Sequence, residues 1–191
     1  MHVLSPWFTC SFGQLTPDEK QKFAKFNIYP GITMLPPLNL LKVSYHYKNV
    51  ETGNYLQTYE ITDAPVFLQW PREIGAYYIL FLLGPDIPTQ DRPLYKYGQH
   101  WVIANIAGNR VDDADVLVEY AGLTHHYLKG PHRMVFLVFK QNYNFTMEFD
   151  LPRLTKNLSG NERLNFSIQN FVDTYYLGRP VAANFFQVYT Y

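Results

Sequence analysis

Three polar side chains that suit a binding site stand next to strongly apolar stretches of this chain. Asp86 lies in the segment 84–88, Gly-Pro-Asp-Ile-Pro, and His132 and Arg133 lie in the segment 130–133, Gly-Pro-His-Arg. A carboxylate accepts hydrogen bonds, an imidazole exchanges protons near neutral pH, and a guanidinium is a fixed cation. Such a set can hold a small anion or support acid–base chemistry, provided that the fold brings its members together.

The apolar stretches beside these residues are predicted to be buried strands. Residues 77–83 run into the first segment, residues 133–139 run out of the second, and residues 100–106 begin with His100. All three stretches are rich in aromatic and branched side chains and lack alternation, so we expect central strands covered on both faces. Binding residues concentrate where a rigid scaffold ends in a loop. His100 and His132 begin neighbouring strands and are therefore expected to face one pocket.

Structural roles compete with a binding role at two of these positions. Asp86 lies between two prolines, where an aspartate often bonds the backbone two residues further on and stabilises the turn. Arg133 lies at the edge of a buried strand, where an arginine pairs with a carboxylate, and Asp86 is one candidate partner. His100, His132 and Asp86 also have the ligand types of a metal triad. Because sequence cannot identify the supporting partners that a metal centre requires, we expect neither a metal nor another cofactor.

The rest of the chain is predicted to be mainly strands with a few helices. The residues Thr16-Pro-Asp-Glu have the pattern of a helix start and predict a helix over 17–26. Apolar residues at helical spacing predict a second helix over 166–177, which Gly178 and Pro180 would end. A short helix is predicted over 112–120. Shorter strands are predicted at four places, residues 41–47, 55–61, 66–70 and 185–191.

The composition argues against several classes of protein. The 191 residues include 16 basic and 16 acidic side chains, and no Lys/Arg cluster indicates a nucleic-acid partner. Cys10 is the only cysteine, which excludes an intramolecular disulfide and a zinc site built from cysteines. No apolar run approaches the roughly 20 residues of a transmembrane helix. The sequence also lacks a nucleophile elbow, a phosphate-binding loop and a dinucleotide-binding turn, so we expect no enzyme activity.

Several motifs, in the same order, resemble those of the phosphatidylethanolamine-binding protein family. They are the Pro-Asp-x-Pro segment at 84–88, a strand at 100–109 that starts with His and ends in Gly-Asn, the Gly-x-His-Arg segment at 130–133 and a C-terminal strand at 180–187. An ordered set is far more specific than any single motif. The resemblance covers residues 36–191 and implies a mainly β domain over 1–191, with two antiparallel sheets in a Greek-key arrangement and a few short peripheral helices. Residues 1–35 would supply a helix and a Pro-rich lead-in.

The resemblance also implies a pocket for an anionic head group. Its ligand-binding residues would be His100, His132 and Asp86, with Tyr95, Gly130 and Pro131 at the rim. Two positions depart from the family pattern, because Gly84 stands where the family has a pocket Asp and Met134 where it has a pocket Tyr. Loss of a carboxylate and of a hydroxyl predicts a less polar, wider pocket that binds a phosphoryl head group more weakly.

We therefore expect a divergent, non-catalytic member of the family that binds a phospholipid head group or a small anion. Family members also inhibit kinases or serine proteases, so a regulator that binds a protein partner is the main alternative. A third is a structural subunit such as the family-like protein of the mitochondrial ribosome, although the basic extensions that RNA contact requires are missing. The N-terminus does not resemble a secretory signal, which favours the cytoplasm. Three N-glycosylation sequons, at Asn144, Asn157 and Asn165, leave secretion open.

Overall fold

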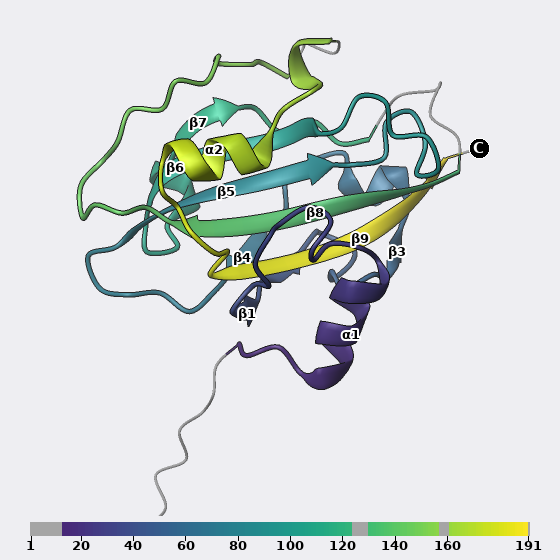
Figure 1. Cartoon of the computed structure of the whole chain (residues 1–191), viewed down its shortest axis with the longest axis horizontal. Helices are drawn as coiled ribbons and strands as arrows, with labels where there is room; N and C mark the ends of the chain where they lie inside the picture. The colour runs from purple at the N-terminus through teal and green to yellow at the C-terminus, as the bar shows by residue number, and fades with distance from the viewer. Residues whose placement is uncertain (1–12, 124–129, 157–160, 191) are drawn as a thin grey trace, which may run out of the picture.

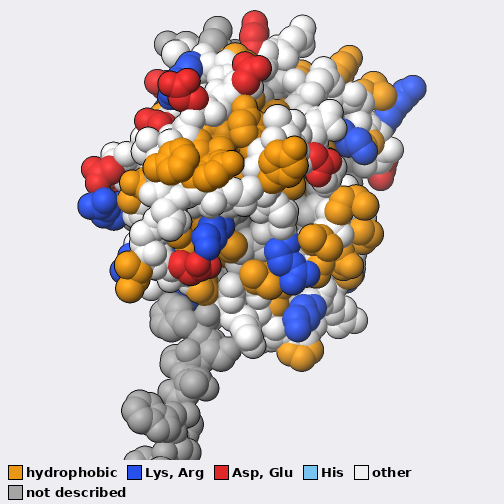
Figure 2. Space-filling model, turned by 60° about the vertical axis from the view of Figure 1, so that its left-hand side comes forward, with side chains coloured by type: hydrophobic (Ala, Val, Ile, Leu, Met, Phe, Trp, Pro, Cys, Tyr) orange, Lys and Arg blue, Asp and Glu red, His pale blue; other side chains and the backbone are white. Residues whose placement is uncertain are grey.

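The structure, a computed structural model, describes residues 13–123, 130–156 and 161–190. Expectations for Cys10, Asn157 and Tyr191 concern residues outside these ranges. None of the helices within them is long and apolar enough to cross a membrane. On the face drawn in Figure 2, basic and acidic side chains are mixed and hydrophobic side chains form patches between them.

A central sheet dominates the described part of the chain, where seven strands take part in it (Figure 1). The spatial order is β1 (Asn39–Leu40), β9 (Ala182–Thr190), β8 (Gly130–Lys140), β5 (Tyr77–Gly84), β6 (Gly98–Ala107) and β7 (Asp115–Val118), and β3 (Tyr55–Leu56) also pairs with β9. The three long apolar stretches are β5, β6 and β8. Because β5 lies between the other two, the prediction that they are neighbouring central strands is confirmed.

The four pairings from β9 across to β7 are antiparallel, whereas the short strands beyond β9 add parallel pairings. β5 pairs with β6 and β8, β8 with β9, and β6 with β7, all antiparallel. The short strands β1 and β3 both pair with β9 in parallel. A second, antiparallel sheet joins β2 (Lys42–Ser44) to β4 (Phe67–Gln69). The mainly β class with two sheets is confirmed, but the larger sheet is not antiparallel throughout.

Different elements cover the two faces of the central sheet. On the helix-covered face, α1 (Pro17–Lys25) places Phe23 5.4 Å from Phe185, and α2 (Ile168–Thr174) places Phe171 5.3 Å from Phe81, as measured between ring centroids. The opposite face packs beneath the β2–β4 sheet, which contributes Val43 and Leu68 to a second apolar cluster. Every residue of β5 after Tyr77 is buried. Burial on both faces explains why the sequence of this strand does not alternate.

Local sequence signals set the starts of both helices. The Thr16 hydroxyl accepts a hydrogen bond from the Glu19 amide at 3.2 Å, and the Glu19 carboxylate accepts one from the Thr16 amide at 2.7 Å. This reciprocal capping box confirms the predicted helix start. α2 begins after Ser167, whose hydroxyl accepts from the Asn170 amide. It ends earlier than predicted, at Thr174, because Tyr176 has a φ of 52° and leaves the helical region.

Two of the predicted elements are wrong in type. The segment 55–61 is a strand only at β3. It continues as a 3-10 turn, η1 (Thr58–Ile61), at whose start the Glu60 carboxylate accepts a hydrogen bond from the Gln57 amide. The segment 112–120 contains the short turn η2 (Val111–Asp113) followed by β7, and not a helix. Pairing with β6 decides the conformation of β7, since tertiary contacts readily override weak local preferences in short segments.

Candidate functional site

The predicted site residues come together at one end of the central sheet. β5 ends at Gly84, β6 begins opposite it at Gly98, and His132 lies two residues into β8. These strand ends are adjacent because both β6 and β8 run antiparallel to β5. The polar residues that flank the apolar stretches in the sequence are therefore neighbours in the fold.

An irregularity in β6 sets the orientation of His100. The pairing of β5 with β6 shifts register between Leu82 and Leu83, so that His100 is the extra residue of a bulge. A Cβ atom built on Gly84 would lie 2.9 Å from Nε2 of His100 and 3.9 Å from Sδ of Met134. Gly84, His100 and Met134 therefore converge on the face of the sheet beneath β2–β4.

The structure places the imidazole of His100 beside Gly84. The ring lies against the Gly84 backbone, in the space that a side chain would need. The ring is therefore packed against the position at which this chain departs from the family pattern. The wider pocket expected from the changes at Gly84 and Met134 stays a prediction.

Both imidazoles are anchored in the same way. Nδ1 of His100 lies 2.8 Å from the carbonyl oxygen of Ala121, and Nδ1 of His132 lies 2.9 Å from that of Asp86. Because a carbonyl can only accept, each Nδ1 carries a proton and donates it, and in the neutral form of the ring Nε2 is then an acceptor. His132 is two residues before Met134 in β8, so both side chains lie on the same face of the sheet, which is also the face of His100. Convergence of both rings on one ligand stays a prediction.

Asp86 and Arg133 form a buried ion pair, which was one of the two structural roles considered for them. The side chain of Asp86 is fully buried, and its carboxylate accepts hydrogen bonds from the backbone amide of Arg133 at 2.7 Å and from Nε at 2.9 Å. The guanidinium also donates to the carbonyl oxygen of Phe26, just after α1. Both carboxylate oxygens of Asp86 accept hydrogen bonds from Arg133. Asp86 therefore positions the site through its backbone carbonyl, which accepts the hydrogen bond from Nδ1 of His132.

The three predicted rim residues lie near the same end of the sheet. The backbone amide of Tyr95 donates to the carbonyl of Ile87 at 3.0 Å, which ties the loop after Asp86 together, and its side chain is 45% exposed. Gly130 begins β8 with a φ of 89°, and Pro131 pairs with β9. Contact of these residues with a ligand stays a prediction.

Sequence reasoning missed a buried arginine that supports the start of β6. Arg163, in the short turn η3 (Asn161–Arg163), donates to the carbonyl oxygens of Gln99 at 3.0 Å, Glu119 at 3.1 Å and Thr155 at 2.7 Å. Burial lowers the pKa of its guanidinium, and the nearby Glu119 opposes that shift. Arg163 joins the residue before His100 to the segment after β7. Its context, Asn-Glu-Arg, has the appearance of an ordinary surface turn and gave no signal.

Within the described ranges, no group of three or more His, Cys, Asp or Glu side chains is arranged to hold a metal ion.

Comparison with known proteins gives relatives of nearly the same length. A Drosophila melanogaster protein with the name "Putative odorant-binding protein A5" is 27% identical over 191 residues, which span 98% of this chain and 89% of that protein. The carboxypeptidase Y inhibitor, solved in complex with its cognate proteinase, superposes with a TM-score of 0.76 at 21% identity, covering 96% of this chain and 98% of the inhibitor. A phosphatidylethanolamine-binding protein from Plasmodium vivax gives 0.66 at 21% identity, covering 90% and 97%. No protein-family model matches the chain.

These findings define the class of protein by its fold. The chain superposes over at least 90% of its length on the carboxypeptidase Y inhibitor and on the Plasmodium vivax phosphatidylethanolamine-binding protein. The chain has the fold of the phosphatidylethanolamine-binding proteins, and the resemblance predicted from its ordered motifs is confirmed.

Proposed function

We propose that this chain is a non-catalytic protein that binds a small anion of the phosphoryl head-group type beside His100 and His132. The observation that carries the proposal is the placement of two buried imidazoles on one face of the sheet, each fixed through Nδ1 to a backbone carbonyl. Rings held in this way need no reordering when a ligand arrives, which lowers the entropic cost of binding. The Plasmodium phosphatidylethanolamine-binding proteins of the same fold support the choice of ligand class.

The chemistry of the proposal rests on Nε2. When an imidazole is protonated, Nε2 becomes a donor, and a nearby anion favours this charged form. Each charge-assisted hydrogen bond contributes about 1.5–3 kcal/mol. Binding of a phosphate group is therefore expected to take up protons and to be tighter at pH 6 than at pH 8. The missing carboxylate and hydroxyl at Gly84 and Met134 are expected to make affinity a hundredfold or more lower than in relatives that have both groups.

Calorimetric titration with O-phosphorylethanolamine and with inorganic phosphate tests this proposal. His132→Ala should weaken binding of both probes by at least about tenfold, because it removes one charge-assisted hydrogen bond. His46→Ala is the matched control, since it removes an exposed imidazole whose ring lies beside that of Tyr47. Equal affinity in wild type and in His132→Ala, with the fold intact by circular dichroism, would overturn the proposal, as would the absence of binding to the wild type at pH 6.

The similarity to the carboxypeptidase Y inhibitor supports a second candidate, an inhibitor that acts through its surface. The superposition spans nearly the whole of both chains, so that no large element of the inhibitor's fold is missing from this one. Titration of carboxypeptidase Y activity with this chain tests the idea. Inhibition at stoichiometric concentration that His132→Ala leaves unchanged would favour the inhibitor over the ligand-binding protein, and full proteinase activity in the presence of excess chain would exclude it for this proteinase.

A further inference from the structure

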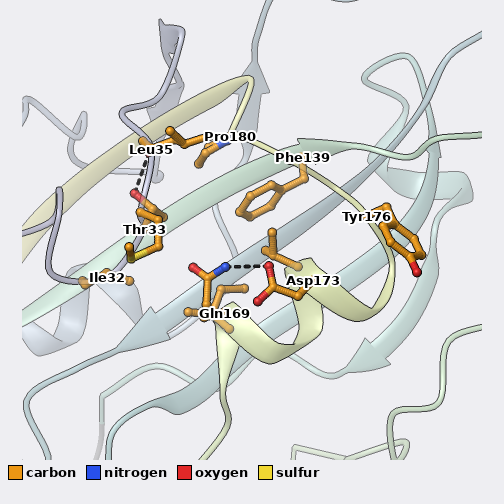
Figure 3. A pocket seen from close by; sticks show the side chains of 12 residues that line it. Ile32, Thr33, Leu35, Phe139, Gln169, Asp173, Tyr176 and Pro180 are labelled. Carbon is orange, nitrogen blue, oxygen red and sulfur yellow. Dashed lines mark hydrogen bonds between the residues drawn. The ribbon is translucent and has the colours of Figure 1, made fainter.

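A cavity of about 450 Å³ lies on the helix-covered face of the sheet, away from the two histidines. Phe139 forms its floor and pairs with Ile79, five residues before Gly84 along β5. At about 3.3 Å per residue, the two sites are separated by roughly 16 Å along the sheet, and they lie on opposite faces of it. Figure 3 shows the ring of Phe139 between the segment that contains Ile32, Thr33 and Leu35 and the helix α2. The cavity is therefore independent of the proposed anion site.

The walls of this cavity are mostly apolar, from the floor to the rim. Phe139 and Ile168 are almost completely buried at the bottom. The rim is formed by Met34, Leu35 and Tyr176, which are 65%, 47% and 80% exposed. Cavities of this size with apolar walls and a few polar groups are typical of small-molecule sites. A ligand with a hydrocarbon body would cover surface that is otherwise exposed to water.

One carboxylate supplies the charged group of the described cavity lining. Asp173 is the only charged side chain among the described residues that line it, and Gln169, one turn earlier in α2, donates a hydrogen bond to Oδ1 of Asp173 at 2.8 Å (Figure 3). The last turn of α2 contains no basic residue, and no described Lys or Arg makes an ion pair with Asp173. Arg179 is close in sequence but does not line the cavity. The rim therefore carries one carboxylate that is in no ion pair with a described Lys or Arg.

We propose that this cavity binds a small apolar amine in its ammonium form, with the hydrocarbon body against Phe139 and the ammonium group at Asp173. Charge decides between the possible head groups. A carboxylate ligand would be repelled by Asp173, a neutral alcohol would gain only an ordinary hydrogen bond, and an ammonium would gain a charge-assisted one. The bond from Gln169 holds the carboxylate at the rim, where it meets the head group while the body remains in the apolar interior.

Three ligands with a common body separate these contributions in calorimetric titrations at pH 7. They are 4-phenylbutylamine, 4-phenylbutan-1-ol and 4-phenylbutyrate. The amine should bind about fivefold more tightly than the alcohol, since an exposed ion pair contributes up to about 1 kcal/mol, and the acid should bind most weakly. Asp173→Asn should make the amine and the alcohol equal. Asp112→Asn, which removes one exposed carboxylate outside the cavity, should leave the fivefold preference unchanged.

Variants of the apolar wall test where the body binds. Val172→Phe extends a lining side chain into the cavity and should reduce the affinity for the amine and the alcohol by at least tenfold. Met34→Ser changes only an exposed rim residue, so folding is not at risk, and should weaken both ligands by about twofold. His132→Ala should leave amine binding unchanged, which keeps this test separate from that of the anion site. The proposal is overturned if the amine and the alcohol bind equally to the wild type, if neither binds, or if both wall variants bind as the wild type does.

Discussion

Removal of the Asp86 carboxylate should destabilise the fold strongly and with a defined physical cause. Asp86→Ala leaves the guanidinium of Arg133 in place, with a side chain that is only 10% exposed and has lost its counter-ion. The carboxylate also accepts a hydrogen bond from the Arg133 backbone amide in β8, which would lose its partner. One substitution thus leaves both a buried cation and a buried amide without the acceptor on which they depend.

The size of the effect follows from this geometry. Breaking a buried ion pair by removing one member costs about 3–5 kcal/mol, because the remaining charge is uncompensated. For a domain of this length, 1 kcal/mol shifts the melting temperature by about 2–4 °C, so the expected decrease is about 6–20 °C. The matched control is Asp113→Ala. Asp113 pairs with Arg110 at 3.8 Å on the surface, where both side chains are 69% exposed, and its loss should cost less than about 1 kcal/mol.

Urea denaturation followed by circular dichroism measures both effects, and a double-mutant cycle isolates the cause. Asp86→Ala combined with Arg133→Met should be less destabilising than the sum of the two single substitutions, since the double variant no longer buries a lone charge. An Asp86→Ala protein as stable as the Asp113→Ala control would refute the reasoning. So would strict additivity in the cycle, because it would mean that the two side chains do not stabilise each other.

Three further predictions address the site, a helix cap and the response to alkaline pH. Gly84→Asp places its Cβ 2.9 Å from Nε2 of His100 and should lower the stability of the fold by about 1–3 kcal/mol through overpacking. Thermal melting measures this loss. Unchanged stability together with an unshifted His100 NMR signal would contradict the prediction. Thr16→Ala removes the cap of α1 and should cost about 1 kcal/mol in the same assay, whereas Thr16→Asn should retain most of the stability. Burial raises the pKa of the Tyr45 and Tyr120 hydroxyls. Their contribution to the free energy of unfolding is therefore complete below the ordinary tyrosine pKa of about 10. It decreases as the pH rises above that value, by up to about 1.4 kcal/mol per pH unit for each hydroxyl. Urea midpoints between pH 9 and pH 11 test this, and an equally steep decline in Tyr120→Phe would count against these hydroxyls as the cause.

The long elements of this protein could be predicted from its sequence because their signals are local and strong. β5 contains seven consecutive apolar residues and β8 six, and the apolar stretch of β6 is interrupted only by Asn105 after His100, a pattern that few structures other than a buried strand satisfy. The start of α1 needs only the four residues from Thr16 to Glu19, which make their capping bonds to one another. Signals of this kind do not depend on what lies elsewhere in the chain.

The short elements could not be predicted in the same way. The segment 112–120 has apolar residues that fit a helix or a strand about equally well, and its pairing with β6 decides the outcome. The segment 55–61 divides into β3, which pairs with the distant strand β9, and a 3-10 turn. In short stretches, the free energy of tertiary pairing exceeds the small differences in local preference.

The candidate site, too, could be predicted from the sequence only in part. The sequence by itself determined which residues stand at the strand ends, and it placed His100, His132 and Asp86 among the candidates. Only the tertiary structure decided their roles. Asp86 binds Arg133 because the end of β5 meets the start of β8, and a bulge turns His100 toward Gly84. Strict alternation would place His100 on the face opposite Trp101, and the position of a bulge is set by register against a strand distant in sequence, which no local pattern contains.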